Sequence, residues 1–170
     1  MMERIEAFFT ELGVERPAVV IEPGRSIAAE AGLSLYTIGS IKDIRDIRKY
    51  VSVDGGMTDN IRPALYQAEY EGLVANKASE PKDDKVTICG KCCESGDILI
   101  KDCMITGTAK AGDLFAMFST GAYGFSMASN YNSNPIPAVV LVKDGKSELI
   151  VKRQSYDDMI KNQLMPEMLK

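Results

Sequence analysis

The chain has 170 residues, 45% of them apolar and 26% charged, with a net charge of −4 and no histidine. This length and composition suit one globular domain, alone or with part of another, and the mixed charges lack the basic stripe of a nucleic-acid binder. No apolar run reaches the roughly 18 to 20 residues that span a bilayer. The first residues lack the apolar centre of a signal peptide, so we expect a cytoplasmic protein with a small-molecule or protein partner.

The first 32 residues predict a short α/β segment. A helix is expected over 2–12, ending at Gly13. The apolar run 18–21 predicts a strand buried on both faces, followed by a turn with Gly24 and a helix over 27–31 that ends at Gly32. Because one such unit cannot bury both faces of its strand, we expect residues 1–32 to be the last strand and helix of a larger α/β structure.

From Leu33 onward, short apolar runs alternate with turn residues, which favours an antiparallel β-barrel or sandwich over residues 33–170. Asp144-Gly145 predicts a hairpin turn. Helical segments are expected near 63–67, 121–129 and 156–164. The expected strands are 35–44, 50–53, 70–74, 86–88, 98–100, 137–142 and 147–151.

The cysteines are Cys89, Cys92, Cys93 and Cys103. Cys89 and Cys92 form a C-x-x-C pair, but a zinc site needs four ligands, and the two remaining cysteines have unfavourable spacing. We therefore predict no metal site. A thioredoxin-type pair would open a helix, whereas residues 94–97 read as a turn, so reduced thiols are expected.

The tetrapeptide Glu22-Pro23-Gly24-Arg25 is the first segment with chemical potential. A glycine between a strand and a helix lets backbone N–H groups approach a phosphate, and a neighbouring arginine adds positive charge. A plain turn before a helix explains the same residues equally well.

Three further segments gather polar and small residues. Residues 51–66 end a strand in two glycines and place Arg62 and Tyr66 one helical turn apart. Residues 92–97 pair a cysteine with a glutamate, and 119–132 surround Tyr123 with small residues. Separately, each has an ordinary structural explanation: a solvated turn, a buried thiol beside a surface carboxylate, or a packed core helix.

In this order, the segments closely resemble the diaminopimelate decarboxylases, within the fold-type III pyridoxal-phosphate decarboxylases. The similarity runs from Pro17 to about Met159, and ornithine and arginine decarboxylases match the middle segment less well. The resemblance implies a β-domain preceded by the last β-α unit of a (β/α)8 barrel. The matching motifs are EPGR (22–25), DGGMTDNIRPALY (54–66), CESGD (93–97) and STGAYGFSMASNYN (119–132).

The resemblance implies a cofactor role for four residues. Glu22 would face the pyridine nitrogen of pyridoxal 5'-phosphate, and Gly24 with the Arg25 backbone would hold its phosphate. Tyr123 would contact both cofactor and substrate.

It implies substrate and catalytic roles as well. Arg25, Arg62 and Tyr66 would hold the distal end of meso-diaminopimelate, whose carboxylate suits paired arginines. Glu94 would complement the distal ammonium, and Cys93 would protonate the substrate carbon after carbon dioxide leaves. The family's Cys-Glu segment enters the partner subunit's site, so a homodimer with shared active sites is expected.

The sequence also departs from the family pattern. No lysine has the context of the cofactor-binding lysine, and the histidine that stacks on the cofactor is absent. We therefore expect the C-terminal part of a lysine-forming decarboxylase, inactive alone. Two other hypotheses remain: a non-catalytic dimerisation or interaction domain, or part of a decarboxylase for a related basic amino acid.

Overall fold

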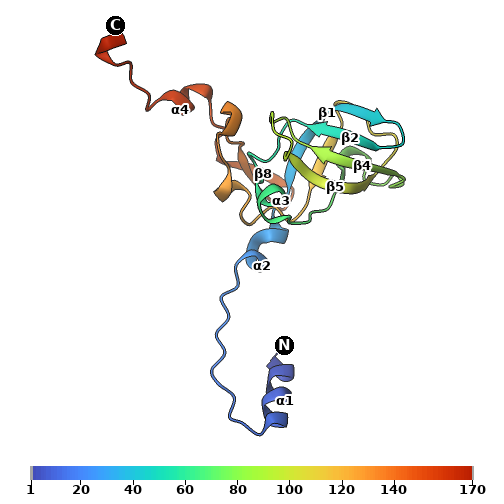
Figure 1. The fold of residues 1–170 in the computed structure, drawn as a ribbon, viewed down its shortest axis with the longest axis vertical. Coiled ribbons are helices and arrows are strands. Elements are labelled where there is room, and N and C mark those ends of the chain that lie inside the picture. The colour runs from blue at the N-terminus through green and yellow to red at the C-terminus, as the bar shows by residue number, and fades with distance from the viewer. Residues whose placement is uncertain (1, 170) are drawn as a thin grey trace.

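A computed structural model describes residues 2–169, and its centre is a six-stranded, nearly closed barrel (Figure 1). The strands follow the order β3-β6-β1-β2-β4-β5, and the edge strands β3 and β5 contact each other. Their bounds are β1 (Ser34–Ile44), β2 (Arg48–Val53), β3 (Gly72–Val74), β4 (Asp84–Cys89), β5 (Ile98–Ile105) and β6 (Leu114–Met117).

The barrel is mixed, which corrects the expectation of a purely antiparallel sheet. Strands β2 and β4 are parallel, with Tyr50 opposite Thr87 and Ser52 opposite Cys89. A parallel pair needs a long crossover, and residues 54–83 provide one that includes α3 (Arg62–Tyr66), β3 and a 3₁₀ turn. The other four neighbouring pairs are antiparallel.

Apolar side chains from all six strands fill the barrel interior. Alternate residues of β1 point inward, so Tyr36 and Ile38 are buried while Leu35 is exposed. Phe115 on β6 is fully buried, and its ring lies against Gly72 of β3, where a Cβ atom would clash with it. This packing holds β3 against β6.

Most predicted strands are confirmed, but β6 was not predicted and two helices are shorter than expected. Residues 121–129 hold only a 3₁₀ turn at Phe125–Met127, since their many small residues cover little apolar surface. The terminal helix is α4 (Tyr156–Ile160), which begins at a Ser155 cap and ends four residues before Leu164. Helix α3 matches its prediction closely.

The N-terminal segment follows its prediction in part. Helix α1 (Met2–Leu12) forms, but residues 18–21 run extended and exposed without pairing to any strand among residues 2–169. A strand requires hydrogen-bonding neighbours, and the barrel offers none at this place. The expected helix before Gly32 appears as α2 (Arg25–Ala28) and a 3₁₀ turn at Ala29–Ala31.

Residues 28–32 pack directly on the segment after β6. Thr120 N–H donates to the Gly32 carbonyl at 3.0 Å, and Gly121 N–H donates to the Ala29 carbonyl at 3.0 Å. Gly32 and Gly121 approach so closely that a Cβ on either would clash with the other's backbone. The α2 segment is thereby fixed to the end of the barrel.

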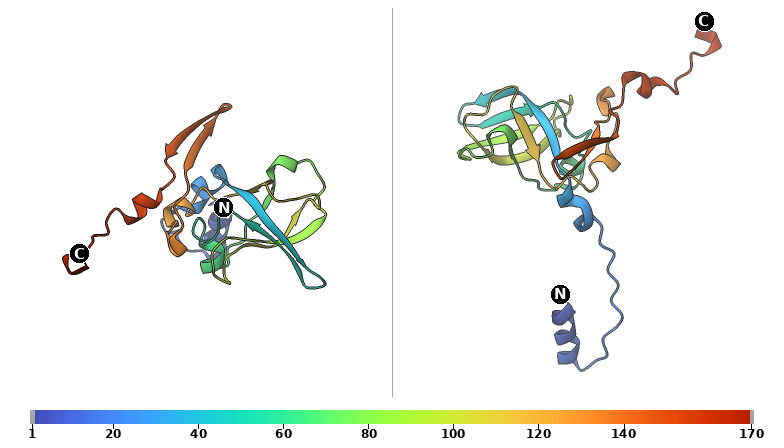
Figure 2. Two further views of the ribbon diagram at one scale, coloured as in Figure 1. Left: turned by 90° about the horizontal axis from the view of Figure 1, so that it is seen from above. Right: turned by 180° about the vertical axis from the view of Figure 1, so that it is seen from behind.

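The C-terminal hairpin of β7 (Val139–Lys143) and β8 (Lys146–Val151) projects from the barrel (Figure 2). Asp144 and Gly145 both adopt positive φ, as expected for their two-residue turn. Many of its apolar side chains are exposed. Within residues 2–169, no helix combines the length and apolarity needed to cross a bilayer.

Candidate active site

Segments that are far apart in sequence converge at the end of the barrel where α2 docks. A Cβ atom on Gly24 would lie 2.6 Å from the Tyr123 hydroxyl oxygen, so the Glu22–Arg25 turn lies directly against this tyrosine. The Arg62 guanidinium carbon lies 5.3 Å from the ring centroids of both Tyr66 and Tyr123. Three of the predicted motifs therefore meet at Tyr123.

Local backbone geometry fixes the position of Arg62. Its backbone N–H donates to the Asn60 side-chain oxygen at 3.2 Å. Pro63 lies in the first turn of α3, and Gln67 ends the helix with a left-handed backbone conformation. One helical turn places Tyr66 beside Arg62, as the spacing predicted. The Arg62 Nε is buried without a hydrogen-bond partner, so this side chain retains an unused donor.

Tyr123 has an unusual backbone conformation, with φ of 60°. The left-handed region costs a residue with a Cβ roughly 1 kcal/mol or more, and such strain persists only where the surroundings impose it. Here Gly124 packs on the Thr120 carbonyl, and Gly121 on α2. The glycines around Tyr123 thus allow its ring to be presented toward Arg62 and Gly24.

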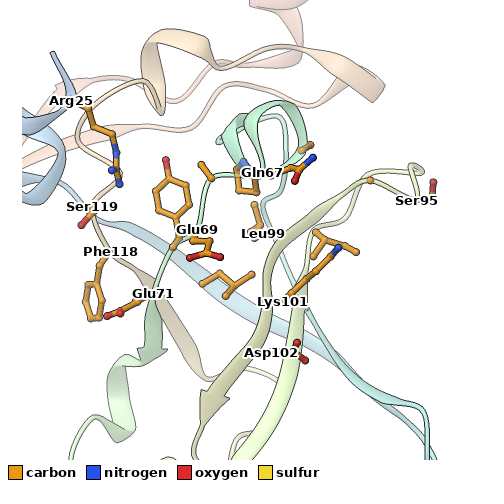
Figure 3. A pocket seen from close by; sticks show the side chains of 17 residues that line it. Arg25, Gln67, Glu69, Glu71, Ser95, Leu99, Lys101, Asp102, Phe118 and Ser119 are labelled. Atoms are coloured by element: carbon orange, nitrogen blue, oxygen red, sulfur yellow. The ribbon is translucent and has the colours of Figure 1, made fainter.

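Arg25 lies on the wall of a cavity of about 1210 Å³ (Figure 3). Its guanidinium carbon is 5.6 Å from the Tyr70 ring centroid, and the buried Tyr70 hydroxyl has no hydrogen-bond partner. Ser95, from the predicted CESGD motif, lines the opposite side of the same cavity. The sequence did not single out Tyr70, because its contact with Arg25 crosses 45 positions of chain.

Cys93 and Glu94 form a second group, in the loop between β4 and β5. Cys93 N–H donates to the Asn132 side-chain oxygen at 2.9 Å, and the Tyr131 hydroxyl lies 3.5 Å from Glu94 Oε2. Hydrogen bonds from Gly96 N–H and the Ser95 hydroxyl lower the pKa of Glu94. This exposed carboxylate is therefore ionised at neutral pH.

The predicted residues thus fall into two groups. No hydrogen bond, ion pair or ring contact joins Cys93 or Glu94 to Arg62, Tyr66 or Tyr123 within residues 2–169. Glu22 is exposed and makes no such contact in that range. Both groups include the segment 119–132, which therefore connects them.

Cys92 and Asp97 lie beneath the second group. Asp97 is 3% exposed and accepts hydrogen bonds from the backbone N–H groups of Met57 and Cys92. Burial raises the pKa of the Cys92 thiol, and the negative charge of Asp97 raises it further, so Cys92 stays protonated. All four cysteines are free thiols.

Comparison with known proteins places this arrangement in a family. Residues 20–121 match the model described as "Pyridoxal-dependent decarboxylase, C-terminal sheet domain". The chain belongs to this pyridoxal-dependent decarboxylase family. The matched range holds the Glu22–Arg25 turn, the six-stranded barrel, Arg62 and the Cys93-Glu94 loop.

Individual members of the pyridoxal-dependent decarboxylase family are similar to this chain in sequence and in structure. The diaminopimelate decarboxylase of Bacillus subtilis (strain 168) is 53% identical over 161 residues, covering 95% of this chain and 36% of the relative. A crystal structure of the M. jannaschii enzyme superposes with a TM-score of 0.81 at 34% identity, covering 99% and 38%. The structure of the same enzyme with L-lysine superposes with a TM-score of 0.80 at 35% identity and covers 97% of this chain and 37% of that chain. The chain thus spans about a third of the length of its relatives and matches their C-terminal part.

The residues that would face the cofactor are chemically suited to it. Gly24 has no room for a Cβ against Tyr123, so its backbone forms a side-chain-free surface, and Arg25 and Arg62 supply cations for anionic groups. Glu22 offers a carboxylate for a protonated ring nitrogen. The donor set fits pyridoxal phosphate and an amino-acid substrate.

Proposed function

We propose that this chain is the C-terminal part of a diaminopimelate decarboxylase, which converts meso-2,6-diaminopimelate to L-lysine and carbon dioxide. The observation that carries the proposal is Arg62, placed between Tyr66 and Tyr123 with a buried, unused Nε donor, where Tyr123 in turn lies against Gly24. Diaminopimelate decarboxylases at about 50% identity support the substrate assignment.

The distal end of the substrate is the part that this chain recognises. Arg62 and Arg25 bind the distal carboxylate, because a guanidinium donates two parallel hydrogen bonds to such a group. Tyr66 holds the Arg62 guanidinium through a cation–π contact. Glu94, ionised at neutral pH, binds the distal ammonium. A substrate ending in a bare amine would leave both arginines unpaired, which disfavours the related basic amino acids.

Cys93 acts at the reacting end of the substrate. Its thiol donates a proton to the carbon from which carbon dioxide has left, and its exposed position leaves it accessible to a substrate. Tyr123 contacts both the substrate and the cofactor. Pyridoxal phosphate, when bound, would supply the electron sink for decarboxylation; Glu22 would hold its ring nitrogen, and Gly24 and Arg25 would hold its phosphate.

A homodimer with shared sites and a cytoplasmic location belong to the same proposal. The absence of contacts between the Cys93-Glu94 group and the Arg62 group within residues 2–169 is expected if a second copy completes each site. Four free thiols suit a reducing compartment. We also propose that the chain divides after residue 32, with residues 1–32 belonging to the α/β barrel and residues 33–170 forming the β-domain.

Reconstitution tests the function. The purified chain is mixed with the remaining N-terminal part of the Bacillus subtilis relative and pyridoxal phosphate. We expect an absorbance band at about 420 nm, typical of the lysine-bound cofactor, and release of carbon dioxide from meso-diaminopimelate. The chain alone should give neither.

The variant Arg62→Gln tests the recognition role, with Arg48→Gln on β2 as the matched control. Loss of a bidentate contact should raise KM for meso-diaminopimelate by about tenfold or more. The polar contacts of the Arg48 side chain within residues 2–169 are with Thr87 and Asp102, so Arg48→Gln should leave KM unchanged. If the wild-type chain binds the N-terminal part of the relative but the mixture shows no turnover, the result would instead favour a non-catalytic interaction domain. Equal effects of the two substitutions would contradict the role of Arg62.

A further inference from the structure

Asp97 is a buried carboxylate that joins two loops of the candidate site. It precedes β5 and is only 3% exposed. Its Oδ1 accepts the Met57 N–H at 2.6 Å, and its Oδ2 accepts the Cys92 N–H at 2.7 Å. Met57 follows β2, whereas Cys92 follows β4, so one side chain bridges the ends of two neighbouring parallel strands.

The two loops are shaped around this carboxylate. A Cβ on Gly56 would lie 2.6 Å from Asp97 Oδ2, and one on Gly90 would clash with the same carboxylate. Both glycines therefore allow a backbone approach that any other residue would block. Two backbone hydrogen bonds close the arrangement: Gly90 N–H to the Asp97 carbonyl and Lys91 N–H to the Gly55 carbonyl, both at 2.9 Å.

Among residues 2–169, no cationic side chain forms an ion pair with the Asp97 carboxylate. The two backbone N–H groups are therefore its main compensation for the loss of water. Hydrogen bonds to an ionised acceptor are about twice as strong as neutral ones. An amide at this position would keep one acceptor oxygen and present an N–H₂ group to the other backbone donor.

We propose that Asp97 is a positioning residue for the reaction proposed above, fixing the Cys93-Glu94 loop against the loop of residues 55–57. Cys93 follows Cys92 directly, so the bond from the Cys92 N–H sets the start of the segment that carries the thiol. The Asn132 side chain holds the next N–H, that of Cys93. The proton donor is thus held by two adjacent backbone bonds, one ending on a rigid buried group.

The first test uses the chain by itself and follows individual amides by hydrogen exchange. In the wild-type chain the Met57 and Cys92 amides should exchange far more slowly than those of residues 18–22, which have no hydrogen-bond partner within residues 2–169. Asp97→Asn should speed exchange at these two amides by about tenfold, the effect of losing a bond worth roughly 1.4 kcal/mol. Exchange in wild type as fast as in residues 18–22 would overturn the proposal, even if the variant did not fold.

Asp113→Asn is the matched control, because Asp113 is equally buried and also accepts a backbone N–H, from Lys110, but lies among Asn76 and Lys77. It should destabilise the barrel without changing exchange at Met57 and Cys92. Similar local exchange in both variants would mean that Asp97 contributes to stability only.

The second test uses the reconstituted decarboxylase and separates kcat from KM. Asp97→Asn should lower kcat for meso-diaminopimelate by about tenfold or more, because Cys93 is displaced, and should raise KM less than Arg62→Gln does, because Glu94 moves with the loop while Arg62 keeps its place. Asp113→Asn should retain kcat. An unchanged kcat for Asp97→Asn would contradict the proposal, whereas a wild-type mixture without turnover would contradict the proposed function and leave the exchange result to decide on Asp97.

Discussion

The rings of Tyr66 and Tyr123 flank the Arg62 guanidinium, and the buried Nε of Arg62 has no hydrogen-bond partner among residues 2–169. Arg62 and Tyr123 belong to recognisable motifs, and their residue types already indicate anion recognition. Tyr70 and Asp97 instead contact distant segments, Arg25 and Met57 respectively; although Asp97 ends the CESGD motif, such contacts depend on the folded backbone. Sequence could therefore predict which residues are presented to a ligand, but not which residues support them.

Asp113 allows a prediction about pH at this scale. Hydrogen bonds from the Lys77 ammonium and the Asn76 amide lower the pKa of Asp113 to about 2. A folded-state pKa below the unfolded value of about 3.9 stabilises the fold above that pH, and the contribution is lost as pH falls toward about 2. The urea midpoint of the wild-type chain should therefore fall between about pH 4 and pH 2.

The substitution Asp113→Asn should reduce this dependence on pH, because the amide does not titrate. Asp144→Asn is its control: Asp144 lies at the exposed β7–β8 turn, makes no ion pair among residues 2–169, and asparagine tolerates its positive φ. Urea titrations at several pH values measure the slopes. Equal slopes for wild type and Asp113→Asn would refute the assignment.

At the scale of elements, apolar runs bounded by turn residues predicted most of the strands, and the prediction failed where pairing partners decide. Strand β1 was predicted within one residue. Strand β6 is four residues long with a continuous apolar pattern, and it is a strand because β1 and β3 pair with both of its edges. Residues 18–21 have equally apolar side chains but no neighbours, so they pair with nothing. The parallel pairing of β2 and β4 likewise depends on the crossover rather than on either strand.

The docking of α2 on the barrel gives a prediction for an element. In Gly121→Ala the new Cβ would clash with the Ala28 carbonyl and lie 2.8 Å from the Gly32 nitrogen, both backbone atoms that cannot rotate away. The backbone must shift, weakening the bonds from Thr120 and Gly121 to residues 29–32. We expect a loss of about 1–3 kcal/mol in the free energy of unfolding.

Gly96→Ala is the control for this substitution, because its nearest neighbours, at 3.6 and 3.9 Å, are ordinary van der Waals contacts. Urea denaturation followed by tyrosine fluorescence measures both variants. A Gly121→Ala variant as stable as Gly96→Ala would show that residues 28–32 are not held against the barrel.

The whole molecule combines a packed barrel with segments whose apolar side chains face solvent. Val20 is 83% exposed and Leu164 is 89% exposed, and both faces of the β7–β8 hairpin carry exposed aliphatic side chains. Isolated exposed apolar residues are common, but their concentration outside the barrel is unusual and marks surfaces suited to contact another chain. This distribution agrees with a chain that matches about a third of its relatives' length.

Limited proteolysis tests this division of the molecule. Thermolysin cleaves before aliphatic residues in extended, unpaired backbone, so it should first cut between Ala18 and Ile21, whose backbones have no hydrogen-bond partner among the described residues 2–169. Strands β4 and β5, equally rich in aliphatic residues, should resist because their backbones are paired and their side chains are buried. The cut chain should keep the unfolding midpoint of the uncut chain, since α1 contributes no buried residue.

Mixing with the N-terminal part of the Bacillus subtilis relative should protect the cleavage site between Ala18 and Ile21 in the proposed enzyme. Early cleavage within β4 or β5 would show that the barrel is not the protected part, and a lower midpoint after the first cut would show that the N-terminal segment stabilises the barrel.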